Sequence, residues 1–249
     1  GLSLVFSIIW PVFGLGLYKF GSLLGSVPYG INSLFFGYIE RALVPFGLHH
    51  AFYIPLWQTA AGGSIVLDDA EAWTRLLNEL KTSAIFINGN EIHSWAEFAK
   101  AFGYNGIATI QGDQNCWAFV NGYIAGHHVK DAAGTDITLT FDHVKKCFDG
   151  VNPGQYMQGK YPFMMFGLPA AAAAIIFAAP KGEGRKIATS AVMGSAGTVF
   201  LTGITEPLEF TFLFLAPVLF YGFHAVFAAI SFWLMNLFGA HMGMTFSGG

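Results

Sequence analysis

Two short stretches of this 249-residue sequence place ionisable side chains inside otherwise apolar segments. The first is GYIERALVPFGLHH (residues 37–50), and the second is GITEPLEF (residues 203–210). An ionised group at the centre of a bilayer costs about 2.5–3.5 kcal/mol on insertion scales, so it needs a partner and commonly marks a site. Side chains of these types could bind a polar substrate in a cavity, or act as a general acid and base.

The second stretch is predicted to interrupt a helix. Pro207 lacks the backbone N–H that a helix requires, and Gly203 can adopt unusual backbone angles. A broken segment at membrane depth is tolerated only where it is buried in protein or lines a polar cavity. We therefore expect Glu206 to face a substrate cavity. The alternative is an interfacial loop whose glutamates are simply solvated.

The first stretch is expected to bring two of its polar side chains together. Arg41 and His49 are eight residues apart, which on a continuous helix is about 80° past two full turns. A chain break near Pro45 could bring them to one place. The alternative is an ion pair between Glu40 and Arg41, with the histidines at a membrane interface.

The composition indicates a membrane protein. Hydrophobic residues make up 54% of the chain and charged residues only 11%, against about a quarter in soluble proteins, and the mean hydropathy is +0.51. The net charge of −3 offers no basic surface for nucleic acid, so we expect no nucleic-acid partner. The two cysteines form no Cys-x-x-Cys motif, which argues against redox chemistry or a zinc framework.

The charged residues divide the chain into apolar blocks around a polar segment. Residues 1–57 hold three charges, residues 58–160 hold eighteen, and residues 187–249 hold two. In the first block, Leu2 to Leu24 is long enough to be a transmembrane helix. Ile31 to Trp57 is a poor straight span, because we expect it to be broken at Pro45, Gly47 and Pro55.

The segment 58–160 is predicted to be a small α+β insertion. Trp73, Leu76, Leu77 and Leu80 fall on one helical face, and Ser94-x-x-Glu97 is a possible capping box for a second helix. Alternation of apolar and polar residues over 137–142 predicts a strand. The lobe also holds three possible metal ligands, but adjacent histidines lack helical metal-binding spacing, so we expect a solvated loop at His127, His128 and Asp131.

The last block, 161–249, is predicted to contain several membrane segments. Tyr161 to Ala179 carries no charge and is expected to span the membrane. The basic loop from Lys181 to Lys186 is expected to be cytoplasmic. Ile187 to Gly249 is long enough for two or more spans, or for one span and a broken hairpin. We find no sequence motif for a metal or an organic cofactor and expect neither.

The two polar stretches resemble the membrane-embedded IIC component of the bacterial phosphoenolpyruvate-dependent sugar phosphotransferase system, glucose superfamily. Gly167-Leu168-Pro169, the alanine run after it and the following basic loop are similar to the same family. The resemblance implies a mainly α, polytopic membrane protein with re-entrant hairpins, in which 58–160 is an addition. It also implies that Arg41 and His49 in the first hairpin, and Thr205 and Glu206 in the second, contact the sugar. A carboxylate and an imidazole suit the hydroxyls of a polyol.

The resemblance further implies a multi-pass permease of the bacterial inner membrane, embedded in the lipid bilayer. Its partner would be a IIB domain or protein that supplies the phosphoryl group from a phosphocysteine. Cys116 and Cys147 lack the IIB signature, so that cysteine is expected elsewhere. The chain resembles the sugar-binding C-terminal half, and we expect it to be a piece of a longer protein that forms a homodimer through its N-terminal half. Residues 52–58 favour a glucose- or maltose-type sugar.

Two other functions remain open on the sequence. One is a membrane-embedded transferase that uses Glu206 and His49 as acid and base; the other, made remote by the uncharged runs, is a soluble binding module. We also expect the lobe to lie outside the cell, because the span Tyr161 to Ala179 leads to a cytoplasmic loop. There Cys116 and Cys147 could form a disulfide, or could be two unrelated buried thiols.

Overall fold

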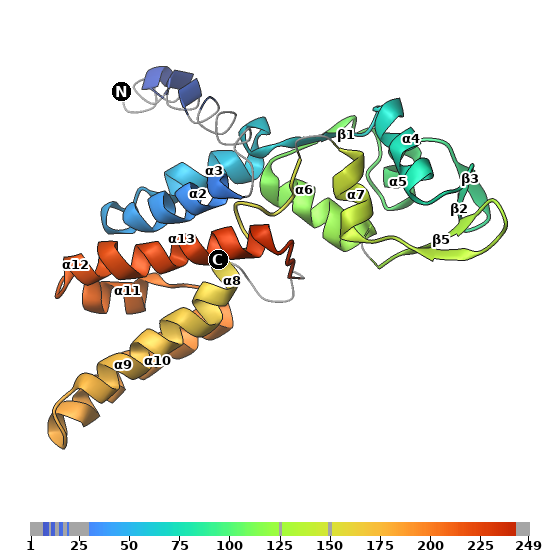
Figure 1. Ribbon diagram of the computed structural model, residues 1–249. Helices are drawn as coiled ribbons and strands as arrows, with labels where there is room; N and C mark the ends of the chain where they lie inside the picture. Colours follow the sequence, from blue (N-terminus) through green and yellow to red (C-terminus); the bar gives the residue numbers. More distant parts are fainter. Residues whose placement is uncertain are drawn as a thin grey trace. The chain divides into compact units, whose positions relative to one another are not determined.

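The computed structural model describes most of the chain, and contacts within it divide the chain into two units (Figure 1). One unit comprises residues 1–26 and 54–154, and the other comprises residues 27–53 and 155–249. The span expected over Leu2 to Leu24 falls largely outside the described residues. Those are residues 7–9, 11–12, 15–16, 19, 30–124, 126–148 and 151–242.

The second unit begins with a helix pair that the sequence predicted only in part. Helix α2 (Ile31–Ala42) ends before the 3-10 turn η1 (Val44–Phe46), Gly47 adopts a left-handed φ of 66°, and α3 (His49–Gln58) follows. The predicted break near Pro45 and Gly47 is therefore present. The predicted break at Pro55 is wrong, because this proline lies inside α3. Its missing N–H costs the helix one bond, but the helix continues to Gln58, and the Pro55 carbonyl accepts from the Thr59 N–H at 3.0 Å.

Two continuous helices of this unit are long and apolar enough to cross a membrane: Lys160–Ala178 and Pro217–Leu237. The first coincides with the span predicted over Tyr161 to Ala179. Each contains a π-helical turn, a feature often found at functional sites. The first helix consists of α8 (Lys160–Pro162), η4 (Phe163–Gly167) and α9 (Leu168–Ala178). The second consists of α12 (Pro217–Leu219), η5 (Phe220–His224) and α13 (Ala225–Leu237).

The helix break predicted at residues 203–210 is also present. Helix α10 (Glu183–Thr202) ends where Gly203 takes a left-handed conformation with φ 78°, and α11 (Glu206–Leu213) starts with Pro207 in its first turn. Gly203 suits this position because a left-handed backbone is strained for residues with a Cβ. Proline fits the first turn because its missing N–H would have no helical partner there. The break places Glu206 at the start of a new helix.

A close crossing of α2 and α13 holds this unit together. Gly37 lies against Ala229 and Phe232, and a Cβ at Gly37 would stand 2.7 Å from the Phe232 ring. Phe36 is fully buried and packs on Phe232 with ring centroids 5.4 Å apart. This packing fixes the last turn of α2, which carries Arg41.

The other unit contains the polar lobe, and its elements mix short helices with short antiparallel strands. Strands β1 and β4 pair, and a second sheet has the order β3-β2-β5-β6. The α+β character expected for the insertion is thus observed. Its elements are β1 (Ser64–Val66), α4 (Ala70–Glu79), β2 (Ile85–Ile87), β3 (Asn90–Ile92), α5 (Trp95–Ala101), β4 (Thr109–Gln111), α6 (Asp113–Phe119), η3 (Val120–Ile124), β5 (His128–Asp131), β6 (Asp136–Thr138) and α7 (Phe141–Cys147).

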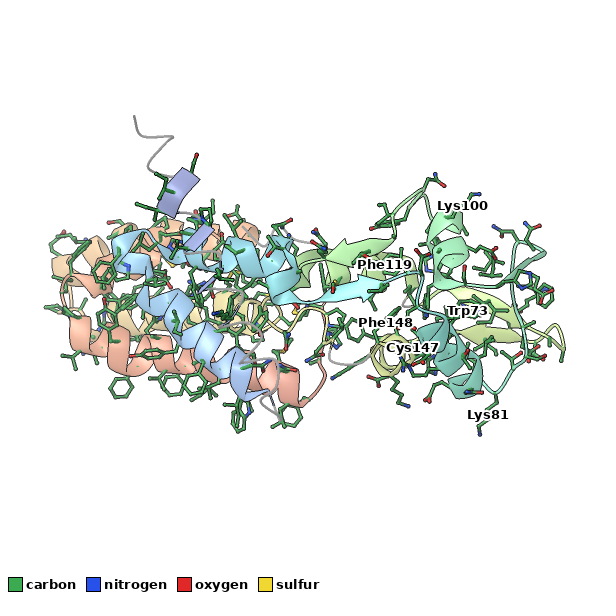
Figure 2. All side chains as sticks on the ribbon, turned by 90° about the horizontal axis from the view of Figure 1, so that it is seen from above. Trp73, Lys81, Lys100, Phe119, Cys147 and Phe148 are labelled. Carbon is green, nitrogen blue, oxygen red and sulfur yellow. The ribbon has the colours of Figure 1, made fainter. Side chains whose placement is uncertain are left out.

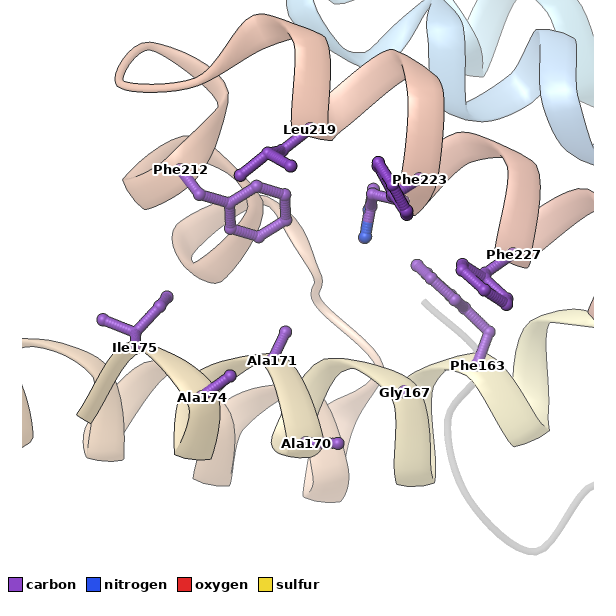
Figure 3. Close-up of a pocket in the computed structure, with 11 residues that line it drawn as sticks. Phe163, Gly167, Ala170, Ala171, Ala174, Ile175, Phe212, Leu219, Phe223 and Phe227 are labelled. Carbon is purple, nitrogen blue, oxygen red and sulfur yellow. The ribbon is translucent and has the colours of Figure 1, made fainter. Parts of the chain in front are cut away.

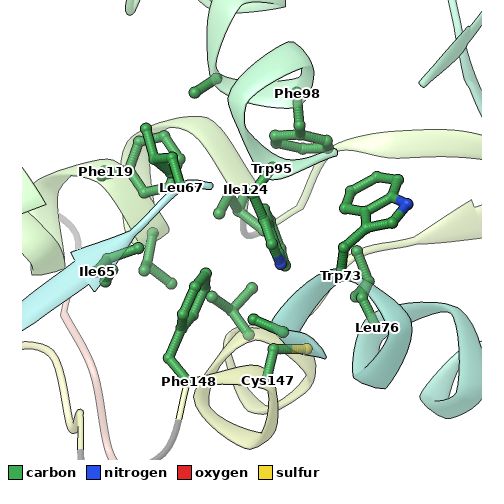
Figure 4. Packing of buried hydrophobic residues seen from close by; sticks show 14 of the residues in the cluster. Ile65, Leu67, Trp73, Leu76, Trp95, Phe98, Phe119, Ile124, Cys147 and Phe148 are labelled. Atoms are coloured by element: carbon green, nitrogen blue, oxygen red, sulfur yellow. The ribbon is translucent and has the colours of Figure 1, made fainter. Parts of the chain in front are cut away.

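The lobe has its own hydrophobic core, in which aromatic side chains from several helices meet (Figure 4). Trp73 and Leu76 on α4 and Trp95 on α5 are buried in it, which confirms the predicted helical faces. Figure 2 shows Trp73, Phe119 and Phe148 within the lobe, whereas Lys81 and Lys100 extend from its surface. Ser94 caps α5 by accepting the Glu97 N–H at 3.1 Å, but Glu97 accepts from the His93 N–H instead of closing a capping box.

The structure corrects one expectation for the lobe and decides between the two alternatives for its cysteines. The strand predicted over 137–142 ends at Thr138, because Thr140 caps α7 by accepting the His143 N–H at 3.4 Å. Cys116 and Cys147 are both buried and free, so they do not form a disulfide. Their thiols donate instead to the carbonyls of Ile110 and His143 at 3.4 and 2.9 Å.

Candidate functional site

A buried charge cluster joins the end of α2 to the start of α11. Arg41 Nη1 donates to Glu209 Oε1 and to Thr205 Oγ1, each at 3.0 Å, and Nη2 donates to Glu40 Oε1 at 3.1 Å. The Arg41 side chain is 2% exposed, and both glutamates are 0% exposed. Charges so deeply buried are stable only when paired and hydrogen-bonded. Both terminal nitrogens of Arg41 are thus used within the protein.

The carboxylate of Glu209 has two further partners. His224 Nε2, in the π-helical turn η5, lies 2.7 Å from Glu209 Oε1, and the Thr205 hydroxyl donates to Glu209 Oε2 at 3.1 Å. These contacts connect three separate elements through one side chain. Glu209 is therefore a structural centre that holds the start of α11 in place.

The more accessible part of the cluster is a second pair, between His49 and Glu206. His49 Nε2 lies 3.1 Å from Glu206 Oε1. His49 is buried at the first turn of α3, while the Glu206 side chain is 29% exposed. Glu206 thus has a carboxylate that a ligand can reach and an imidazole beside it. Both groups can exchange hydrogen bonds with hydroxyls.

The structure brings the four predicted site residues together in two contacting pairs. Arg41 contacts Thr205, and His49 contacts Glu206, although the partners are more than 150 residues apart in each pair. The Glu40–Arg41 ion pair, one part of the alternative considered for the first stretch, is present as well. One guanidinium therefore makes both the ion pair with Glu40 and the hydrogen bond to Thr205.

Two buried or part-buried polar side chains near the site, His224 and Lys160, are not predicted from the sequence. His224 lies in an aromatic stretch of the sequence. Nothing in that stretch indicates that the His224 side chain bonds to a carboxylate. Lys160 was assigned to the end of the polar segment, yet it is buried at the first turn of α8, with its ammonium 5.8 Å from the centre of the Tyr53 ring. Its position directly before the uncharged run Tyr161 to Ala179 is the sequence feature that could have indicated its burial.

A cavity of about 540 Å³ lies in the same unit, and its chemistry does not suit a sugar (Figure 3). Its walls are alanines of α9 and the aromatic and aliphatic side chains of α11, α12, η5 and α13. His224 is its polar side chain, but this imidazole is already bonded to Glu209. A polyol there would lose hydrogen bonds to water without replacing them. We therefore place the candidate site at His49 and Glu206.

Comparison with known proteins identifies the family. The family described as "Phosphotransferase system, EIIC" matches residues 1–229. The chain belongs to this EIIC family. The resemblance noted from the two polar stretches is thereby confirmed.

Two curated EIIC relatives have similar sequences. The PTS system glucose-specific EIICBA component of Mycoplasma pneumoniae is 35% identical over 356 aligned positions, which cover 99% of this chain and 38% of the relative. The component of the same name from Mycoplasma genitalium is 35% identical over 348 positions, with the same coverage. The chain thus spans 38% of the length of each relative. EIIC proteins are membrane permeases, which agrees with the two candidate spans among the described residues.

Proposed function

We propose that this EIIC chain binds a glucose-type sugar, carries it across the bacterial inner membrane and presents it for phosphorylation by a IIB partner. The observation that supports this most is the partly exposed Glu206 carboxylate paired with the His49 imidazole. A carboxylate that can accept hydrogen bonds from two hydroxyls suits a pyranose in a water-poor cavity. The names of the two relatives favour glucose over maltose.

Within this proposal, the four predicted residues divide into two roles. Glu206 and His49 contact the sugar, because the Glu206 carboxylate is partly exposed and the His49 imidazole lies beside it. Arg41 and Thr205 are positioning residues, because both are buried and bonded to Glu209. They hold the start of α11, and with it Glu206, in the geometry that the sugar requires.

The proposal extends to topology and assembly. The stretches around residues 37–50 and 203–210 are two re-entrant hairpins that bring the site to membrane depth, and residues 58–160 are an inserted lobe. The phosphoryl group comes from a phosphocysteine of IIB, so Glu206 and His49 bind and orient the sugar without becoming nucleophiles. A homodimer through the N-terminal half of the permease completes the assembly.

The test is sugar affinity in the purified full-length protein. Glu206→Gln keeps the shape of the side chain but removes its charge, so glucose affinity should fall by at least ~1.5 kcal/mol, or roughly tenfold in Kd. Glu183→Gln is a matched control, because Glu183 also begins a helix but lies in the exposed basic loop. Isothermal titration calorimetry measures both.

Unchanged glucose affinity in Glu206→Gln would contradict the proposed binding site. Product released from glucose without any added phosphocarrier would favour the alternative, a transferase that uses Glu206 and His49 as acid and base. A IIC permease domain should instead bind glucose saturably in that assay and release no product.

A further inference from the structure

The candidate site also brings together three side chains that can bind a metal ion. His49, His50 and Glu206 each offer one ligand atom, and these atoms all lie within 4.8 Å of one another. The His49 and His50 rings have centroids 4.1 Å apart, and Glu206 Oε1 is 3.1 Å from His49 Nε2. Two imidazoles and one carboxylate are the protein ligands of several zinc sites that keep a fourth position open.

The spacing is close to what such a metal needs. With bonds of about 2.0–2.2 Å in a tetrahedral arrangement, ligand atoms stand roughly 3.4 Å apart. Because the ligand atoms lie within 4.8 Å of one another, no pair of them has to close by more than about 1.4 Å. His50 is exposed and Glu206 is partly exposed, so both can make this movement.

Two details of the imidazoles favour metal binding. His49 directs Nε2 towards Glu206 Oε1, 3.1 Å away, so this nitrogen and the carboxylate oxygen can hold one ion between them. His50 Nδ1 is bonded to the Tyr53 hydroxyl, which orients its ring and leaves the other nitrogen available. The nitrogen-rich ligand set prefers ions such as Zn²⁺ over Mg²⁺ or Ca²⁺, which prefer oxygen.

We propose that His49, His50 and Glu206 form a binding site for a divalent transition metal of the zinc class, and that the bound metal excludes the sugar. The exclusion rests on the proposed function, because Glu206 is shared between the two ligands. Sequence reasoning missed this site because the two histidines are adjacent and the third ligand lies 157 residues beyond His49. The metal thereby acts as an inhibitor of sugar uptake.

Cobalt titration of the purified full-length protein tests metal binding directly. Co²⁺ in a four-coordinate site gives strong visible absorption, and Zn²⁺ should displace it. His50→Gln should weaken Co²⁺ binding at least about tenfold, because it removes one ligand. His50→Cys supplies another zinc ligand and should restore binding, which a merely structural role of His50 would not explain. His128→Gln, at an exposed position of β5 in the lobe, is the control and should bind Co²⁺ like the unaltered protein.

The inhibitory role is tested in the same titration with saturating glucose. The proposal predicts that glucose lowers the apparent Co²⁺ affinity and that Co²⁺ lowers glucose affinity. Absence of Co²⁺ binding, or equal Co²⁺ affinity in His50→Gln, would overturn the metal site. Co²⁺ and glucose bound together without competition would overturn the exclusion. A protein that binds Co²⁺ but no glucose would contradict the proposed function and leave the metal site standing.

Discussion

Glu206 and Glu209 stand three residues apart on α11 but have different surroundings. Glu209 is fully buried and bonded to Arg41, Thr205 and His224. Glu206 is partly exposed and contacts His49. A buried carboxylate with several partners stabilises the fold, whereas an accessible one can exchange its partner for a ligand. Under the proposed function, Glu209 therefore holds the site in place and Glu206 binds the sugar.

Arg41 is predicted to be essential for stability. Arg41→Met leaves two fully buried carboxylates, Glu40 and Glu209, without their cation, so the free energy of unfolding should fall by about 3–5 kcal/mol. Lys186→Met in α10 is the control: its ion pair with Glu183 is exposed, and the variant should lose about 1 kcal/mol or less. Denaturant unfolding of the purified proteins measures both, and equal losses would contradict the buried cluster.

The two cysteines are predicted to be unreactive in the folded protein. Burial raises the pKa of both thiols to about 12, against about 8.5 for an exposed thiol. Because the folded state favours the protonated thiol, this contribution to stability is complete below about pH 8.5 and is lost as the pH rises towards 12. Labelling with a disulfide reagent at pH 8 should be slow in the folded protein and fast after denaturation. Rapid labelling of both thiols in the folded protein would contradict their burial.

At the scale of elements, two glycines in helices have opposite surroundings. A Cβ at Gly37 in α2 would collide with Phe232 of α13, whereas a Cβ at Gly194 in α10 meets nothing within 4 Å. Gly37→Ala should therefore destabilise the protein by about 1–3 kcal/mol through overpacking. Gly194→Ala should stabilise it by roughly 0.5–1 kcal/mol, because alanine favours a helix. Thermal unfolding compares the two variants, and a neutral Gly37→Ala would contradict the close crossing of α2 and α13.

The sequence predicted the helix breaks well where one residue type dictates the backbone. Gly47 and Gly203 both take the left-handed conformation that ends a helical segment, and Pro207 begins the next helix. Pro55 failed as a predictor because a helix can lose one hydrogen bond and continue. The strand over 137–142 failed because Thr140 forms a local helix cap that competes with strand pairing.

The site was only partly predictable for a different reason. The cost of charge in an apolar run identified Glu206 and Arg41 from the sequence alone. The bond between Glu209 and His224 depends on where the π-helical turn η5 directs an imidazole. That direction is set by tertiary packing, which the spacing of residues does not determine. The contact of Lys160 with the Tyr53 ring is a tertiary contact of the same kind.

At the scale of the whole molecule, the lobe is predicted to lie outside the cell. The basic loop from Lys181 to Lys186 is expected inside, and the helix Lys160–Ala178 then begins on the outer face, directly after the lobe. A membrane-impermeant amine reagent added to intact cells should label Lys100 and Lys130, which are exposed in the lobe. Lys181 should be labelled only after lysis. Protection of both lobe lysines until lysis would refute this topology.

A double-mutant cycle on glucose affinity tests most directly whether His49 and Glu206 act as one sugar site. Isothermal titration of the full-length protein compares His49→Gln, Glu206→Gln and the double variant. Because the two side chains are in contact, their effects should be coupled by about 0.5–3 kcal/mol. Each single variant should weaken glucose binding, and the double variant should differ from the sum of the two by that amount. Additive effects, or glucose affinity unchanged in both single variants, would contradict a shared sugar site.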